Sequence, residues 1–366
     1  MKTTNGSVLV LLVLAAPLAA APAPATAPPP AEIKSHAAPY PTFGSIERLD
    51  PALDKLIPPD AKIEKLAEGF DWIEGPVWVQ GKKAKESGYL LFSDIPPNSI
   101  YKWSEGAGIT LFMKPSGCHA DCEPLKEPGT NALAVDKKGN LIMCEHGDRR
   151  LARLASLAQP NGKQVPLAAK YDGKRFNSPN DMAIHSSGDI FFTDPPYGLS
   201  QKDPAKKDQF PGQEMKIQGV YRLDTKGKVT LLTDVLERPN GIALSPDEKT
   251  LYVANSHGPR PIWMAFEVKP DRTLGPGRVF FDATALIAKT KRTGNPDGMK
   301  ADKNGNLFAT GPGGVLIFSP EGKHLGTILT GQATANVAFG DDGSSLYITA
   351  DPFLARVKTK TKGMGF

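Results

Sequence analysis

One polar pattern recurs along this 366-residue chain and limits the folds open to it more than any other feature. In its clearest copy, residues 295–310, an Asn-Pro-Asp-Gly corner leads into an alternating segment, an Asp-Lys-Asn-Gly turn and a second alternating segment. Alternating segments joined by a turn of this composition predict a β-hairpin. The corner of this copy is Asp297, and comparable corners precede comparable hairpins at positions 74, 131, 180, 240 and 336. The chain therefore holds six copies of one hairpin unit.

The spacing of the corners predicts an all-β fold, a six-bladed β-propeller with a central channel. Successive corners lie 39 to 60 residues apart, which suits four-stranded blades with loops of varied length. A β-sandwich would not reuse one polar corner at matching positions, whereas in a ring of blades each corner faces the channel. We expect the propeller to span residues 59–360, with residues 63–72 pairing beside the last strand, near residue 357, to close the ring. The insertion at residues 201–218 is expected to be a solvated surface loop or, alternatively, a lid over the channel.

The N-terminus has the composition of an export signal. Lys2 precedes an apolar run at residues 8–20, which is too short to span a bilayer and is followed by small residues. We therefore expect a signal peptide over residues 1–25, with an uncleaved anchor as the alternative. An Ala/Pro-rich linker and N-terminal segment over residues 26–58 should follow. These features predict an exported protein, periplasmic or secreted, that has no membrane attachment once the signal is cleaved.

The three cysteines have a spacing that matches no zinc site. In an exported protein, Cys118 and Cys122 are expected to form a local disulfide, and Cys144 to be a buried free thiol. The formal net charge of +5 comes from scattered basic and acidic residues, with no basic run backed by aromatic residues. This distribution argues against nucleic-acid binding. We expect a small-molecule ligand and a monomer or weak dimer.

Four corners supply oxygen donors of two kinds, carboxylate and amide: Glu74, Asn180, Asn240 and Asp297. If the repeats share one geometry, these oxygens converge on the axis at one end of the channel. Such donors suit a hard divalent cation, Ca²⁺ above all, with Zn²⁺, Mg²⁺ and Mn²⁺ left open. The channel of the propeller is therefore predicted to bind a metal. The structural alternative is that each asparagine merely caps a turn.

The ordered set of motifs resembles the senescence-marker-protein/gluconolactonase/luciferin-regenerating-enzyme-like family of sugar-lactonase propellers. The resemblance covers residues 60–358 and is carried by Glu-Gly-Pro-Val-Trp at 74–78, Phe-Ser-Asp-Ile at 92–95, Ser-Pro-Asn-Asp at 178–181, Arg-Pro-Asn-Gly at 238–241 and Pro-Asp-Gly-Met at 296–299. It implies a six-bladed propeller that hydrolyses sugar lactones with one divalent metal ion as cofactor. It also implies that Glu74, Asn240 and Asp297 are metal ligands, and that Asn180 contacts the substrate or the metal.

Two further residues are candidates for substrate binding through this resemblance. His146 belongs to residues 144–150, Cys-Glu-His-Gly-Asp-Arg-Arg, which look like a variant of a family signature. Sugar lactonases of animal type carry an arginine two residues before the asparagine that matches Asn180. Here Ser178 occupies that position, and the nearest arginine is Arg175.

The predicted function is metal-dependent opening of a sugar lactone, a gluconolactonase-like ester hydrolysis. The metal would polarise the lactone carbonyl and stabilise the oxyanion as water attacks. Asp297 is the candidate catalytic base, with a hydroxide on the metal as the alternative. No Gly-x-Ser-x-Gly motif points to a serine nucleophile. The same fold would also suit an aryl-ester or organophosphate hydrolase on the same metal site, or a non-catalytic propeller that binds a carbohydrate or protein partner.

Overall fold

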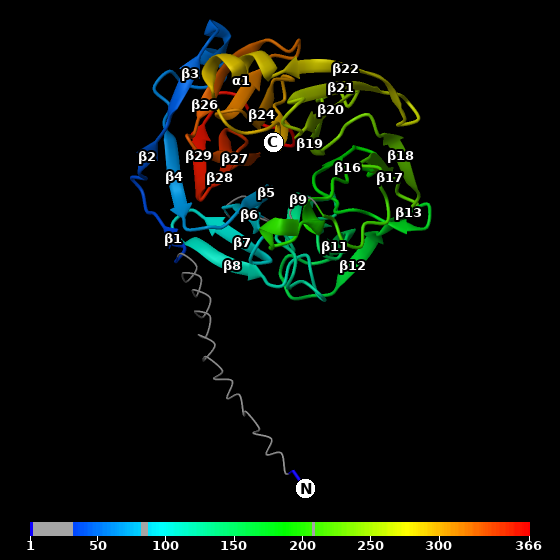
Figure 1. The fold of residues 1–366 in the computed structure, drawn as a ribbon. Coiled ribbons are helices and arrows are strands. Elements are labelled where there is room, and N and C mark those ends of the chain that lie inside the picture. Colours follow the sequence, from blue (N-terminus) through cyan, green and yellow to red (C-terminus); the bar gives the residue numbers. More distant parts are fainter. Residues whose placement is uncertain (3–31, 82–86, 207–208) are drawn as a thin grey trace. The chain divides into compact units, whose positions relative to one another are not determined.

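Six antiparallel sheets of four to six strands surround a common axis in the computed structural model, which describes residues 1–2, 32–81, 87–206 and 209–366 (Figure 1). Residues Glu32–Phe366 form one compact unit. The all-β, six-bladed propeller predicted from the repeats is confirmed. The predicted signal peptide falls almost wholly outside the described residues. No helix in the described part of the chain is long and apolar enough to cross a membrane.

Four blades are built from consecutive strands, with the first strand of each nearest the axis (Figure 1). They comprise β5 (Ile73–Val79), β6 (Tyr89–Asp94), β7 (Ser99–Ser104) and β8 (Gly108–Met113); β9 (Thr130–Val135), β10 (Leu141–Glu145), β11 (Arg150–Leu154) and β12 (Gln164–Ala168); β15 (Met182–Ile184), β16 (Ile190–Thr193), β17 (Val220–Leu223) and β18 (Val229–Thr233); and β19 (Pro239–Leu244), β20 (Thr250–Asn255), β21 (Ile262–Val268) and β22 (Leu274–Asp282). Each inner strand contacts the inner strand of the next blade, so the corners, which lie at or just before the first residues of these strands, are brought together.

The fifth and sixth blades also use strands from the N-terminal segment. The fifth contains β23 (Met299–Ala301), β24 (Leu307–Gly311), β25 (Gly314–Phe318), β26 (His324–Leu329) and β3 (Ser45–Arg48); the sixth contains β27 (Ala333–Gly340), β28 (Ser345–Asp351), β29 (Phe353–Lys358), β4 (Ile63–Glu68), β1 (Lys34–Ser35) and β2 (Thr42–Phe43). The predicted closure is confirmed, because β4 pairs with β29 and sets Glu64 opposite Arg356. The Arg356 Nε atom lies 2.7 Å from Glu64 Oε2 across this seam.

The hydrophobic core is divided into clusters that lie between neighbouring blades. Trp263 and Phe318 pack between the fourth and fifth blades, and Phe308 and Phe339 between the fifth and sixth. A blade with neighbours on both sides buries both faces of its strands. For this reason a strand such as β25 is buried throughout and reads as a continuous apolar run rather than as an alternation.

The turn within the fifth-blade hairpin shows why the repeat has its composition. Asp302 Oδ1 accepts hydrogen bonds from the N–H groups of Asn304 (2.9 Å) and Asn306 (2.8 Å). Between them Gly305 has a φ of +86°, a conformation that residues with a side chain rarely adopt. The Asp-Lys-Asn-Gly sequence therefore fixes the hairpin that follows the Asp297 corner.

The compact unit begins earlier than the predicted boundary at residue 59. Composition predicted a linker and N-terminal segment over residues 26–58, but the part of it that the structure describes contributes β1, β2 and β3 to two sheets, with a short 3₁₀ helix, η1 (Pro51–Lys55). The open edges of β4 and β26 account for this difference, since an edge strand offers unpaired N–H and C=O groups to any nearby extended segment.

Several short elements lie outside the blades: the hairpin β13 (Lys170–Tyr171) and β14 (Lys174–Arg175), the 3₁₀ helices η2 (Tyr197–Leu199) and η3 (Pro204–Lys206), and α1 (Thr284–Thr290). The expected disulfide joins Cys118 to Cys122, and Cys144 is a buried free thiol. The insertion at residues 201–218 is only partly solvated: Gln201 pairs with Leu125 of the disulfide loop, and Met215 is buried.

Candidate functional site

Five of the six corners of the repeats line one cavity of about 270 Å³ at one end of the inner strands. Its lining consists of Trp72, Glu74, Glu127, Asn131, Asn180, Tyr197, Asn240, Ser256, Gly294, Asn295, Asp297, Ala333 and Thr334. All four residues predicted from the corners as metal ligands are in this set. The structure thus brings together Glu74, Asn180, Asn240 and Asp297, which come from four different blades.

Glycines beside the corners allow the inner strands to approach closely. A Cβ atom on Gly75 would lie 2.2 Å from the carbonyl oxygen of Asn131 in the next blade. A Cβ atom on Gly241 would lie 2.2 Å from the carbonyl oxygen of Asp297. Both distances are far below van der Waals contact, so only glycine permits this packing. The corner sequences Glu-Gly and Asn-Gly therefore serve to bring the corner side chains of adjacent blades to one point.

Hydroxyl groups at the ends of second strands hold the corner of the following blade. Ser93 Oγ, on β6, donates to the carbonyl oxygen of Asn131 at 2.7 Å. Thr193 Oγ1, on β16, donates to the carbonyl oxygen of Asn240 at 2.7 Å. These bonds are buried, and they fix the backbone from which the corner side chains project.

The residue two positions before a corner is also held within its own blade. Asp94 Oδ1 accepts from the N–H of Trp72 at 2.9 Å, and Asn255 Oδ1 accepts from the N–H of Arg238 at 3.0 Å. Each acceptor stands at the end of the second strand of its blade. The approach to the Glu74 and Asn240 corners is therefore fixed by side chains of the same repeat.

In the protein without a bound cation, the pKa values of the two corner carboxyl groups are raised, so that both groups ionise less readily than usual. Burial raises the pKa of Glu74 to about 7, although its carboxylate accepts from the Gly75 N–H (2.8 Å) and from Asn336 Nδ2 (3.0 Å). Burial, together with the negative charge of Glu74, raises the pKa of Asp297 well above its usual range. The Lys300 ammonium group favours ionisation of Glu74 but does not offset its burial. A cation between these carboxyl groups would reverse both shifts.

Several oxygen atoms at the cavity are buried without a hydrogen-bond donor among the described residues. They are Asn131 Oδ1, Asn180 Oδ1 and Asp297 Oδ1. A buried hydrogen-bond acceptor without a partner lowers the stability of the fold by roughly 1–3 kcal/mol. Three such oxygens at one cavity therefore point to a ligand, such as a cation, that binds oxygen atoms. In the described part of the chain, no three His, Cys, Asp or Glu side chains are grouped to hold a metal. A cation site here would therefore combine two carboxylates with amide oxygens, a set that fits calcium.

Two predicted substrate-binding residues do not line the cavity, which corrects their placement from sequence. His146 is fully buried beneath Gly198, where a Cβ on that glycine would lie 2.5 Å from the His146 side chain. Burial lowers the pKa of His146 to about 4, so the imidazole is neutral. Arg175 lies on β14, and its Nη2 donates to the carbonyl oxygen of Asp148 at 3.3 Å. Both stand close to site motifs in the chain, but neither is among the residues that line the cavity.

Nine of the thirteen lining residues were not predicted as site residues, among them Asn131, Glu127 and Tyr197. Asn131 occupies the corner of the second repeat, so its position in the repeat was a sufficient signal. Glu127 precedes β9 in the disulfide loop, and Tyr197 lies in η2. Neither belongs to a periodic segment, so only the folded positions of these loops place them at the cavity.

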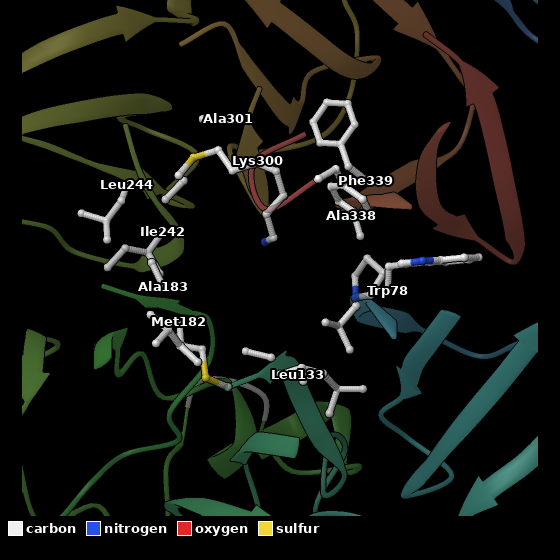
Figure 2. A pocket seen from close by; sticks show the side chains of 18 of the residues that line it. Trp78, Leu133, Met182, Ala183, Ile242, Leu244, Lys300, Ala301, Ala338 and Phe339 are labelled. Carbon is white, nitrogen blue, oxygen red and sulfur yellow. The ribbon is translucent and has the colours of Figure 1, made fainter. Parts of the chain in front are cut away.

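A second cavity, of about 320 Å³, opens at the other end of the inner strands (Figure 2). It is lined mainly by later residues of the same strands, including Trp78, Leu133, Met182, Ile242 and Leu244. Lys300 extends a single amine into this apolar surface. The polar chemistry of the molecule's axis is therefore concentrated at the corner end, where the carboxylate and amide oxygens lie.

Comparison with known proteins places these features in a family. A gluconolactonase from Zymomonas mobilis subsp. mobilis is 40% identical over 334 residues, covering 88% of this chain and 88% of that protein. The solved structure of a gluconolactonase from Xanthomonas campestris is 30% identical and has a TM-score of 0.72, with 87% of this chain and 97% of that chain covered. A regucalcin structure from Agrobacterium tumefaciens shares the fold, at 21% identity and a TM-score of 0.59, covering 88% of this chain and 96% of that one.

The match to the family is continuous across the blades. Residues 72–351 correspond to the SMP-30/Gluconolactonase/LRE-like region, a span that begins at the cavity-lining Trp72 and includes all six corners. The resemblance inferred from the motifs is confirmed, and this chain belongs to the SMP-30/gluconolactonase/LRE-like family.

Proposed function

We propose that this protein hydrolyses a sugar lactone, gluconolactone or a close analogue, at the corner cavity with the help of one divalent cation. The observation that carries the proposal is the convergence on one small cavity of the two corner carboxyl groups and of three buried oxygens that have no hydrogen-bond partner among the described residues. The identity with the Zymomonas mobilis gluconolactonase, spread over most of both chains, supports the choice of a lactone.

Glu74, Asn180, Asn240 and Asp297 would hold the cation, and calcium fits these oxygen donors best. When bound, the cation would polarise the lactone carbonyl and stabilise the negative charge that develops on its oxygen. It would also keep Glu74 and Asp297 ionised at neutral pH, against the effect of burial.

The side chains of the cavity would then position the reactants. With its Oδ1 held by the cation, the amide NH₂ group of Asn180 would be free to donate to an oxygen of the lactone. Asp297 would take a proton from the attacking water. Tyr197, on η2, lines the cavity with its hydroxyl 3.4 Å from the carbonyl oxygen of Ser256, and would restrict the entry of bulk water.

We also propose that the protein is exported. The charged and apolar composition at the N-terminus supports this, as does the Cys118–Cys122 disulfide, because disulfides persist mainly in oxidising compartments.

The proposed activity predicts catalysed release of acid from δ-gluconolactone. A pH-stat should record turnover on the order of 10 to 10³ s⁻¹ above the spontaneous rate, with gluconic acid as the product by NMR. Phenyl acetate, an open-chain aryl ester, should be hydrolysed at least ~10-fold less efficiently, since it lacks the hydroxyl groups that polar lining residues would bind. Turnover of phenyl acetate above that of every sugar lactone would contradict the proposal.

A further inference from the structure

The cavity is also lined by a carboxyl group that is not one of the corners, that of Glu127. It lies in the loop between β8 and β9, two residues before the anchored Gly129, whose N–H donates to the Ile95 carbonyl oxygen at 3.0 Å. On its other side, the Lys126 N–H donates to the Ser200 carbonyl oxygen at 2.8 Å. Glu127 is therefore held between two fixed points at the rim of the cavity.

The rest of the loop is fixed as well. The Cys118–Cys122 disulfide closes its tip. The Asn98 side chain binds the loop: Nδ2 donates to the Cys118 carbonyl oxygen at 2.8 Å, and Oδ1 accepts from the N–H groups of Ser116 (2.9 Å) and Gly117 (2.8 Å) and from the Ser116 hydroxyl (3.2 Å). A side chain carried by such a loop has a defined place in the site, which catalysis requires.

The Glu127 carboxyl group makes no polar contact among the described residues that would stabilise the fold. Among the described residues it makes no side-chain hydrogen bond or ion pair, yet it lines the cavity with Asp297 and Asn180. Its charge contributes, after burial and the charges of Glu74 and Asp181, to raising the pKa of Asp297. Burial raises the pKa of Glu127 itself to about 7, although the neighbouring Lys126 acts in the opposite direction.

Opening a lactone requires such a group. The leaving atom is the ring oxygen, and a sugar alkoxide is a poor leaving group unless it receives a proton as the C–O bond breaks. The titratable side chains of the described lining are Glu74, Glu127, Tyr197 and Asp297. Glu74 and Asp297 carry no proton when they hold a cation, and burial raises the pKa of Tyr197 to about 12, which makes it a weak acid. Of these four side chains, Glu127 is the one that can hold a transferable proton from the start of the reaction, before any proton has left the water.

We propose that Glu127 is the general acid of lactone opening, an inference that rests on the proposed lactonase function. The oxygen of water bonds to the carbonyl carbon, and its proton passes to Asp297. The bond between the carbonyl carbon and the ring oxygen then breaks, and the ring oxygen keeps the electron pair and takes the proton of Glu127. The proton on Asp297 returns to Glu127 through solvent, so that lactone and water give one hydroxy acid.

The test compares Glu127→Gln with wild type and with Glu123→Gln, a matched control in the same loop whose side chain is 92% exposed. On δ-gluconolactone, kcat of Glu127→Gln should fall ~100-fold, within the range for general acid catalysis, while KM changes less than ~3-fold. On dihydrocoumarin, whose leaving group is a phenolate that needs little protonation, the loss should be less than ~5-fold. Glu123→Gln should match wild type on both substrates.

The outcomes separate the role of Glu127 from the proposed function. Equal losses on the two lactones, or a loss confined to KM, would overturn the assignment as proton donor and leave a positioning role. Wild-type rates for Glu127→Gln on δ-gluconolactone would overturn it as well. A wild-type protein that opens neither lactone would instead refute the lactonase function, and the assignment with it.

Discussion

Hydrolysis of δ-gluconolactone by the Asp297→Asn variant should be slower than that of wild type by on the order of 10³-fold or more. The substitution removes a negative charge from the candidate cation site and, with it, the proposed acceptor of the proton of the attacking water. Both losses act on the same step, so little turnover should remain. The measurement is kcat/KM in a pH-stat at saturating calcium, with the spontaneous rate subtracted.

A variant that misfolds would lose activity whatever the role of Asp297. The unfolding temperature of Asp297→Asn tests for misfolding, because the charge of Asp297 affects stability. In the absence of a cation, burial and the Glu74 carboxylate disfavour the ionised form of Asp297. An uncharged asparagine relieves that strain, so Asp297→Asn should unfold at the same temperature as cation-free wild type or at a higher one. Asp60→Asn, at an exposed position, serves as the control and should keep full activity. Turnover by Asp297→Asn within ~3-fold of wild type would remove Asp297 from the mechanism.

Calcium affinity should fall at least ~100-fold in Glu74→Gln, because the charge of the ligands largely sets the strength of an oxygen-ligated calcium site. Glutamine keeps the shape of the side chain and an oxygen that can accept from Gly75 and Asn336. The variant therefore isolates the effect of the charge. Isothermal titration of calcium into the chelator-treated protein measures the affinity directly, without reference to catalysis.

Glu267→Gln is the matched control for this titration, since Glu267 is exposed on β21, far along the chain from any corner. Its calcium affinity should equal that of wild type. If Glu74→Gln bound calcium as tightly as wild type did, Glu74 would not be a ligand, and the site would have to lie elsewhere.

The repeats made the architecture predictable because one physical device is used in every blade. A corner, an alternating strand and an Asx-Gly turn recur at propeller spacing, and the closing strand at Ile63 follows from the need to cover an edge. The convergence of Glu74, Asn180, Asn240 and Asp297 on one cavity follows from the same symmetry. The local sequence is sufficient to place a residue in the fold wherever that residue belongs to a repeat.

Features that depend on loops were beyond the sequence. His146 and Arg175 were proposed for the cavity from their nearness to motifs along the chain, but packing under Gly198 and the β13–β14 hairpin places them elsewhere. Glu127 lies outside the repeated hairpins, so no periodic pattern in the sequence identifies it as a site residue. The Ala/Pro-rich composition before residue 59 predicted a linker, yet sheet edges recruited residues as early as Lys34. In each case the position of the residue in the fold is set by tertiary contacts that the local sequence does not reveal.

The most direct test of the central claim is lactone hydrolysis by one protein sample before cation removal, after it and after calcium is restored. Wild-type protein is assayed on δ-gluconolactone, treated with chelator, desalted and assayed again, and then titrated with calcium. The stripped protein should retain roughly a hundredth of the initial rate or less, and calcium should restore the activity with a stoichiometry of one ion per chain. Full activity in stripped protein that contains no detectable metal would contradict a cation-assisted lactonase at the corner cavity.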